Sequence, residues 1–287
     1  MNENLLERVS SESLDDILGK EFKVLDKGFI RVVDYMGTDS SIVQAARVSY
    51  GKGTKTKSED QGLISYLMEH GHTTPFEMCE IKVHVKMPIF VARQWVRHRT
   101  ANINEYSGRY SLMPNEFYIP SPGEIAFQST NNKQGRGEHA DNEIAESVIK
   151  EIEEQCENSY EKYQKLLGIE NEDGEGLSRE LARIILPLNT YTEWYWKIDL
   201  HNLFHFLHLR MDSHAQYEIR VYADQLAEIV KLWVPYAWQA FEQHNLDAQT
   251  FSSAEISQLK DVIDLDSLKG NGKFSQKQIN SLLHKLK

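Results

Sequence analysis

Residues 80–88, EIKVHVKMP, constrain the fold of this chain more than any other stretch. From Ile81 to Met87 every second side chain is apolar, and the side chains between them are lysine or histidine. A period of two indicates a strand that buries one face. Pro88 cannot donate to a sheet ladder and suits the first turn of a helix. We therefore expect a strand that stops at Pro88 and a helix from there through Val96.

Strands and helices follow one another irregularly along the rest of the chain. β-branched residues on either side of the Asp-Lys-Gly turn at 26–28 predict a pair of strands, and the aromatic run at 189–197 predicts another. Apolar spacings of three and four predict a long helix over 144–167, and further helices are expected over 199–210 and 215–233. No Gly-x-Gly-x-x-Gly follows a strand. These features favour an α+β fold, a mixed sheet with packed helices, over a Rossmann fold.

Composition divides the 287 residues into three predicted parts. Residues 1–20 are expected to form a loosely attached, acidic leader, residues 21–243 the main domain, and residues 244–287 a polar C-terminal appendage. Within the main domain, residues 121–142 are polar and contain glycine. We expect that segment to be a mobile excursion on the surface.

The charge and the cysteine content exclude several classes of protein. A net charge of −11 opposes the broad basic field that proteins coating DNA or RNA need, although a few Arg residues could still hold one phosphate. No apolar run approaches the roughly 20 residues that span a bilayer, and the acidic N-terminus is unlike a signal peptide. Cys79 and Cys156 are too few for a disulfide framework or a thiolate zinc site. We therefore expect a cytoplasmic protein that binds neither nucleic acid nor membranes.

Positive charge is concentrated in the segment RHRTANINEYSGRY at 97–110. The basic triplet 97–99 alone would be explained by the favourable interaction of cations with a helix C-terminus. The residues that follow, however, offer amides, hydroxyls, a carboxylate and a glycine, and Arg is the side chain suited to bidentate phosphate binding. Arg183 and Arg210, far away in the sequence, could supply matching groups. The segment is therefore predicted to bind an anionic ligand.

The spacing within this segment is also similar to a known motif. Arg-His-Arg, seven residues and then Ser, here Arg97 to Ser107, resembles the signature of the flavin-dependent thymidylate synthases. The stretches DKGFIRVVDYMG, AARVSYGKG, HGHTTPFE, PIFVARQWVRHR, ARIILPLNTYTEWYW and HFLHLRMDSHAQYEIR resemble this family as well. The resemblance covers about residues 21–243, so the main domain is identified as a flavin-dependent thymidylate synthase domain. Asn102 stands where the family often has Ser, and it is also a small hydrogen-bonding residue.

The resemblance implies an enzyme of the thymidylate synthase-complementing fold that converts dUMP to dTMP. Its carbon donor would be methylenetetrahydrofolate, and NADPH would be its reductant, acting through bound FAD. The resemblance further implies a homotetramer whose subunits share their active sites. Such enzymes do not attack the uracil ring with a cysteine, which agrees with Cys79 and Cys156 at positions that we expect to be buried or at a strand edge.

Roles for individual residues also follow from the resemblance. Arg210 would stabilise the negative charge that develops on the pyrimidine, and it is the first choice for catalysis. Ser107 could take part in catalysis but is better explained as a residue that positions the ligand, since only His98 in its segment could act as its base. The residues implied for dUMP binding are Gln94, Trp95, Val96, Arg97, Glu105, Tyr106, Ser107, Gly108, Arg109, Arg183 and Arg210. Those implied for FAD binding are Thr74, Arg97, His98, Arg99, Glu105, Asp199, Leu200, His201 and His205.

Two other functions fit parts of the sequence. His201 and His205 lie at helical spacing, and with His70 and His72 they could be ligands in a metal-dependent nucleotide phosphohydrolase. No His-Glu-x-x-His accompanies them, so flavin contact is the favoured explanation and no metal site is predicted. The Arg-rich segment and the aromatic run could instead serve a non-catalytic nucleotide- or RNA-binding module. The acidic net charge disfavours that function, and an alternating aromatic run is typical of a packed strand.

Overall fold

The computed structural model describes residues 8–48, 57–169, 175–263 and 276–285. The chain divides into two compact units, Met1–His244 and Asn245–Lys287. In the described part of the second unit, α11 (Ser253–Val262) begins at a capping box formed by Ser252 and Glu255, and α13 is Gln276–Lys285. Residues 264–275 and 286–287 of the predicted appendage and residues 1–7 of the predicted leader lie outside the described residues. No helix in the described ranges is both long enough and apolar enough to cross a membrane.

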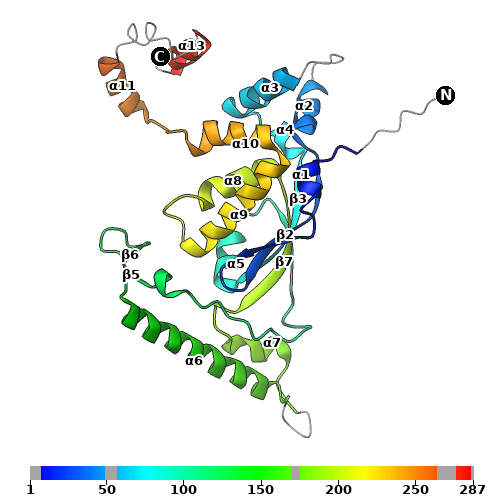
Figure 1. Cartoon of the computed structure of the whole chain (residues 1–287), viewed down its shortest axis with the longest axis vertical. Coiled ribbons are helices and arrows are strands. Elements are labelled where there is room, and N and C mark those ends of the chain that lie inside the picture. The colour runs from blue at the N-terminus through cyan, green and yellow to red at the C-terminus, as the bar shows by residue number, and fades with distance from the viewer. Residues whose placement is uncertain (1–7, 49–56, 170–174, 264–275, 286–287) are drawn as a thin grey trace, which may run out of the picture. The chain divides into compact units, whose positions relative to one another are not determined.

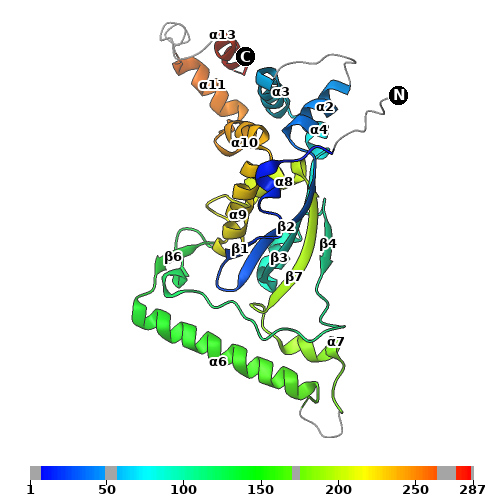
Figure 2. The same ribbon diagram turned by 45° about the vertical axis from the view of Figure 1, so that its right-hand side comes forward.

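The first unit is built on a five-stranded sheet in the order β1-β2-β3-β7-β4 (Figures 1 and 2). Its strands are β1 (Glu21–Val24), β2 (Gly28–Met36), β3 (Glu80–Pro88), β4 (Asn102–Glu105) and β7 (Tyr191–Asp199). The predicted α+β class is confirmed, but every pairing in this sheet is antiparallel where a mixed sheet was expected. The chain leaves β2 at Met36 and re-enters the sheet at Glu80, which pairs with Met36, so the direction must reverse.

Strand β3 has the alternating burial that its sequence predicts. Its apolar side chains from Ile81 to Met87 are fully buried, whereas Lys82 and His84 lie on the half-exposed face. The strand includes Pro88, which is also the N-cap of α5 (Ile89–Trp95). Strand β3 therefore ends and α5 begins at Pro88, because proline has no backbone N–H to donate to the sheet. This junction fixes the direction in which α5 leaves the sheet.

Helices α5, α8 (Leu200–Arg210) and α9 (Tyr217–Trp233) pack against the sheet (Figure 1). Their contact is formed by large aromatic side chains, of which Trp95, Trp196 and Phe206 are completely buried. The Trp95 ring lies 5.2 Å from Trp196 and 4.8 Å from Phe206, between their ring centroids. Burying a side chain such as Phe206 stabilises the fold by about 1.5–3 kcal/mol. This core holds the C-terminal ends of α5 and α8 close together.

A further group of helices completes the unit. It comprises α1 (Glu12–Asp15), α2 (Asp39–Val48), α3 (Lys57–Glu69), α4 (Thr74–Glu77) and α10 (Pro235–Phe241), and the π-helical turn Glu242–Leu246 crosses the boundary at His244. Within the predicted leader, Leu14 is fully buried and the backbone N–H of Ser11 donates to the Tyr35 hydroxyl at 2.7 Å. Residues 11–15 are therefore packed against the domain and are not the loosely attached segment that we expected.

The segment predicted to be a mobile excursion contains ordered structure. It forms the short helix η1 (Pro122–Glu124) and a hairpin of β5 (Ala126–Gln128) and β6 (Arg136–His139). Arg136 of this hairpin forms an ion pair with the buried Glu218 of α9, which anchors the hairpin. The long helix α6 (Asn142–Leu166) follows, and Gly168 comes directly after its C-cap with a φ of +67°. Two short helices, α7 (Arg179–Ala182) and η2 (Arg183–Ile185), then lead to β7.

Candidate active site

One cavity lies where the chain leaves the edge strand β4. Glu105 is paired with Trp194 of β7, and the N–H of Tyr106 still donates to the Glu193 carbonyl at 2.8 Å. The chain then turns sharply, because the N–H groups of Tyr110 and Ser111 both donate to the Ser107 carbonyl at 3.0 and 3.1 Å. This turn, residues 107–111, forms one wall of the cavity.

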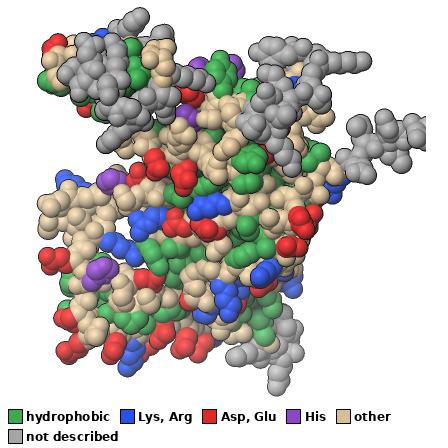
Figure 3. Space-filling model, turned by 45° about the horizontal axis from the view of Figure 1, so that its top comes forward, with side chains coloured by type: hydrophobic (Ala, Val, Ile, Leu, Met, Phe, Trp, Pro, Cys, Tyr) green, Lys and Arg blue, Asp and Glu red, His purple; other side chains and the backbone are tan. Residues whose placement is uncertain are grey.

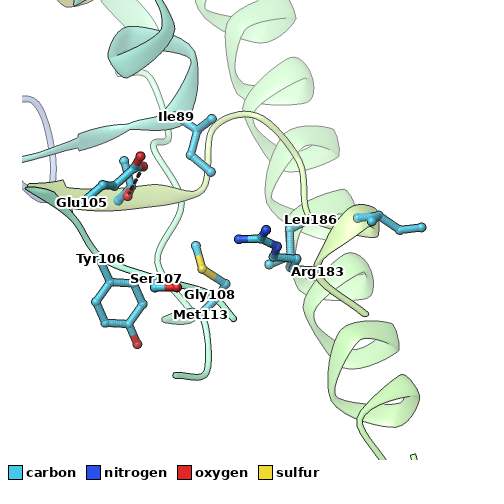
Figure 4. A pocket seen from close by; sticks show the side chains of 10 residues that line it. Ile89, Glu105, Tyr106, Ser107, Gly108, Met113, Arg183 and Leu186 are labelled. Atoms are coloured by element: carbon cyan, nitrogen blue, oxygen red, sulfur yellow. Dashed lines mark hydrogen bonds between the residues drawn. The ribbon is translucent and has the colours of Figure 1, made fainter. Parts of the chain in front are cut away.

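Helix η2 forms the opposite wall of this cavity, which has a volume of about 480 Å³. Figure 4 shows the Arg183 guanidinium pointing towards the turn that contains Ser107 and Gly108. Glu105 is fixed at the sheet edge by the Thr192 hydroxyl, which donates to its Oε1 at 2.8 Å. The lining residues are Ile89, Glu105, Tyr106, Ser107, Gly108, Met113, Arg183, Ile184, Leu186 and Thr192. We call this space the Arg183 pocket.

Gly108 has a packing role in the Arg183 pocket. A Cβ atom at this position would lie 2.7 Å from Met113 Sδ and 3.3 Å from Arg183 Cδ. Met113 cannot easily retreat, because it is buried in a cluster with Tyr163 and Ala182. Only glycine therefore lets the turn approach Arg183 this closely.

A second cavity, of about 420 Å³, lies between the C-terminal ends of α5 and α8. We call it the Arg210 pocket. It is lined by Arg97, His98, Arg99, Thr100, Ile198, Asn202, His205, Leu209 and Arg210. Arg210 Nε donates to His98 Nε2 at 3.0 Å, and Arg210 Nη2 donates to the Gln94 carbonyl at 3.4 Å. These two hydrogen bonds, one to Gln94 of α5 and one to His98 in the segment after it, hold the Arg210 guanidinium in a defined orientation.

The protonation state of His98 suits this arrangement. Burial, followed by the positive charge of Arg210 and the nearby His205, lowers the pKa of His98 to about 4. The ring is therefore neutral at physiological pH, and its Nε2 can accept the hydrogen bond from Arg210. The His98 ring also packs edge-on against Phe206, with 4.8 Å between the centroids. Burial and the charge of Arg97 lower the pKa of Arg210, but a guanidinium still stays protonated.

A pH dependence of stability follows from the lowered pKa of His98. In the unfolded chain its pKa returns to about 6.5. Between about pH 6.5 and pH 4 the unfolded chain therefore binds up to about one proton more than the folded chain, and the free energy of unfolding falls as the pH falls. We expect urea unfolding at pH 7.5 and pH 5 to show a smaller decrease for His98→Gln than for the unsubstituted protein. His208→Gln, on the exposed side of α8, is the control. An equal decrease in all three proteins would contradict the assignment.

Comparison with known proteins identifies the family. The pattern of the family described as "Thymidylate synthase complementing protein" matches residues 31–236. The chain belongs to this family. Its similar relatives are named flavin-dependent thymidylate synthase: that of Ehrlichia ruminantium (strain Gardel) is 58% identical over 92% of this chain and 86% of the relative. That of Rickettsia conorii is 56% identical over 91% of each chain. The resemblance inferred from the Arg97 to Ser107 motif is therefore confirmed.

Solved structures agree with this membership of the thymidylate synthase complementing proteins. The UMP/dUMP methylase PolB from Streptomyces cacaoi, bound with 5-Br UMP, is 31% identical with a TM-score of 0.69, covering 78% of this chain and 98% of that chain. The same protein bound with 5-Br dUMP is 29% identical with a TM-score of 0.70, covering 78% of this chain and 99% of that chain. The predicted fold type is therefore confirmed.

Several residues implied for dUMP binding by this family lie away from the Arg183 pocket. Trp95 is completely buried among aromatic rings, so its side chain cannot contact a ligand in this structure. Val96 is exposed, and the side chain of Gln94 donates to Gln216. Arg109 does not line the pocket, because its Nε forms an exposed ion pair with Glu180 Oε2 at 3.1 Å.

The residues implied for FAD binding are only partly brought together. The Arg210 pocket is lined by four of them, Arg97, His98, Arg99 and His205. Glu105 lines the Arg183 pocket instead, and Thr74 is exposed at the start of α4. Asp199 caps α8, and its two carboxylate oxygens accept from the N–H and the side-chain amide of Asn202 at 2.9 and 2.8 Å. His201 is half-buried near the start of the same helix. Leu200 is completely buried and its N–H donates to the Cys79 carbonyl at 2.8 Å, so its side chain cannot reach a cofactor in this structure.

Sequence reasoning missed several lining residues. Thr192 and Met113 line the Arg183 pocket, and Thr100 and Asn202 line the Arg210 pocket. Asn202 could have been found from the sequence, because it lies one helical turn before His205 and close to the same face. The pairing of Thr192 with Glu105 depends on the sheet register and has no local signal.

The phosphohydrolase alternative depends on histidines that could bind a metal ion. Among the described residues, no group of three or more His, Cys, Asp or Glu side chains is arranged to hold a metal ion. His70 instead stacks on Tyr66, with 4.1 Å between the ring centroids. Burial raises the pKa of the Cys79 thiol to about 12 and also raises the pKa of Cys156. Neither thiol is therefore activated as a nucleophile.

Proposed function

We propose that this protein is a flavin-dependent thymidylate synthase. It methylates dUMP to dTMP with methylenetetrahydrofolate as the carbon donor and NADPH as the reductant, through bound FAD. One observation carries the proposal: residues of the Arg97 to Ser107 motif and two distant arginines, Arg183 and Arg210, line two pockets in a fold shared with a protein bound to 5-Br dUMP. High identity to proteins named flavin-dependent thymidylate synthase supports it.

The phosphate of dUMP fits the Arg183 pocket. A nucleotide monophosphate carries nearly two negative charges, which require several charge-assisted donors. Arg183 and the Ser107 hydroxyl face the same space, and Arg109 belongs to the same turn as Ser107. Arg109 would join the phosphate by leaving Glu180, because their ion pair is exposed and therefore weak.

The pyrimidine ring of dUMP is assigned to a position beside the Arg210 guanidinium. Transfer of a carbon to C5 requires negative charge to develop on the uracil ring, and a fixed guanidinium stabilises that charge without losing its own proton. The contacts of Arg210 with His98 and the Gln94 carbonyl provide the necessary orientation. Ser107 lies in the other pocket, where its Oγ accepts from the Arg109 N–H at 3.3 Å. His98 is committed to Arg210, so Ser107 is assigned to ligand positioning.

The Arg210 pocket fits an anionic cofactor with a flat ring. Arg97 and Arg99 are exposed cations for a pyrophosphate, while Ile198, Leu209 and His205 provide apolar and aromatic surface. These residues would hold FAD, which supplies the hydride-transfer chemistry that side chains lack. Arg210, held by the neutral His98 ring, would keep positive charge beside the bound groups.

The separation of the two pockets supports an active site shared between subunits. Within one chain, Arg183 and Arg210 line different cavities, so a complete dUMP site needs groups from a second copy. Ile184, which lines the Arg183 pocket, and Leu181 and Leu188, close to it in the sequence, are exposed, as expected for a subunit contact. A homotetramer remains part of the proposal.

The proposal includes a cytoplasmic location and no binding to nucleic acid or membranes. Figure 3 shows acidic and basic side chains interspersed on one face of the molecule rather than a single basic field. The aromatic run supports the same view, because Tyr191, Trp194 and Trp196 are buried in the core. The two cysteines are free and buried, which suits a reducing compartment.

An absorption spectrum of the purified protein tests the proposed function. We expect flavin bands that bleach when NADPH is added, and formation of dTMP when dUMP and methylenetetrahydrofolate are also present. A colourless protein whose nucleotide hydrolysis is inhibited by chelators would support the phosphohydrolase instead.

A further inference from the structure

A chain of hydrogen bonds connects α5 with the first turn of α9. The Gln94 amide, at Nε2, donates to Gln216 Oε1. Gln216 Nε2 then donates to Glu218 Oε2 at 2.8 Å. Gln216 is the N-cap residue of α9, and the side chain of Glu218 is buried in the first turn of that helix. Two segments that are 122 residues apart are therefore joined by side-chain amides.

This chain of hydrogen bonds has a direction. A carboxylate can only accept, so Glu218 requires the NH₂ group of Gln216 to face it. The Gln216 oxygen must then face Gln94, which can satisfy it only with its own NH₂ group. The Gln94 carboxamide is thereby held in one of its two orientations. Its oxygen and its second N–H remain available to a ligand.

The buried carboxylate is compensated by the hairpin of β5 and β6. Arg136 Nη2 donates to Glu218 Oε1, and the Tyr118 hydroxyl lies 3.3 Å from the same oxygen. Burial and the charges of Glu218 and Glu124 raise the pKa of Tyr118, so the hydroxyl keeps its proton and can donate. The Arg136 guanidinium also lies over the Tyr217 ring, 5.3 Å from its centroid. An unpaired carboxylate at this depth would be costly, so the hairpin stabilises the whole chain of contacts.

The same glutamine adjoins the Arg210 pocket. The Gln94 backbone carbonyl accepts from Arg210 Nη2 at 3.4 Å, and Arg97, which lines the pocket, follows three residues later. We propose that Gln216 and Glu218 are positioning residues, which hold the Gln94 side chain in the orientation that binds the nucleotide. They act through Gln94 and do not touch the ligand. This inference rests on the proposed function, since it takes dUMP as the nucleotide.

Substitution of Gln216 tests the inference. Gln216→Met keeps the length of the side chain but removes both hydrogen bonds. We expect the Kd for dUMP, measured from the change in the flavin spectrum, to rise about fivefold. This factor corresponds to the free energy of one neutral hydrogen bond. We expect kcat at saturating dUMP to stay within about twofold, because the contact acts in binding. Gln225→Met, at a half-buried position on the same helix, is the matched control and is expected to change neither value.

A second variant and a double-mutant cycle separate positioning from folding. Glu218→Gln keeps the shape of the side chain but lets the Gln216 amide reverse, so we expect a smaller rise in the Kd for dUMP. In a Gln94→Ala background, Gln216→Met should add no further loss of dUMP affinity. An unchanged affinity in Gln216→Met, or a loss that persists in full without the Gln94 side chain, would overturn the inference.

The same cycle distinguishes this inference from the proposed function. If the unsubstituted protein does not bind dUMP, the proposed function fails. Urea unfolding of the ligand-free Gln94→Ala, Gln216→Met and doubly substituted proteins still measures the coupling between the two residues. We expect non-additive losses of stability. Additive losses would overturn the chain of hydrogen bonds whatever the substrate.

Discussion

An Arg210→Ala variant is expected to lose dTMP formation by about a hundred- to a thousandfold while it still binds flavin. Removing one preorganised group that stabilises developing charge typically costs this much in kcat. The guanidinium is held by His98 and the Gln94 carbonyl, so no other side chain can take its place without reorganisation. Flavin binding should largely survive, because Arg97, Arg99 and His205 remain in the pocket. Single-turnover dTMP formation and the flavin absorption spectrum measure the two effects separately.

Two controls define what Arg210 contributes. Arg210→Lys keeps the positive charge but cannot contact His98 and the Gln94 carbonyl together, so we expect only partial recovery of activity. Arg220→Ala removes an exposed guanidinium that donates to the Ser213 carbonyl, and it should leave turnover unchanged. Turnover of Arg210→Ala near the unsubstituted level would remove Arg210 from the chemistry.

An Arg183→Ala variant is expected to bind dUMP about ten- to a hundredfold more weakly. A hydrogen bond to a charged group contributes about 1.5–3 kcal/mol, and this guanidinium faces the Ser107–Gly108 turn where the phosphate is assigned. Because the phosphate does not react, kcat at saturating dUMP should change less than the affinity. Isothermal titration of dUMP into the flavin-bound protein measures the change.

Neighbouring arginines serve as comparisons for Arg183. Arg179→Ala removes a donor to the Tyr110 carbonyl and lies outside the pocket lining, so its effect on dUMP affinity should be small. Arg109→Ala should also weaken dUMP binding, but less than Arg183→Ala, since Arg109 must first leave Glu180. An unchanged affinity in either Arg183→Ala or Arg109→Ala would remove that residue from the phosphate site.

Much of the architecture could be predicted from local patterns. The alternation in residues 80–88 predicts a half-buried strand, and the apolar spacing in 144–167 predicts a long helix; both are present as β3 and α6. Such patterns reflect which face of an element is buried, and that depends on neighbours only a few residues away. The motif from Arg97 to Ser107 and the stretches on either side of it identified the family, whose pattern matches residues 31–236.

The sequence by itself therefore determined the class of fold, the family and a set of cationic and hydrogen-bonding residues, several of which line the two pockets. Only the tertiary structure decided that Arg183 and Arg210 line separate pockets, that Trp95 and Leu200 are buried, and that Arg136 anchors a supposed surface excursion. The physical reason is that these outcomes depend on contacts between segments far apart in the chain. Sheet register and helix packing set such contacts, and no local spacing encodes them.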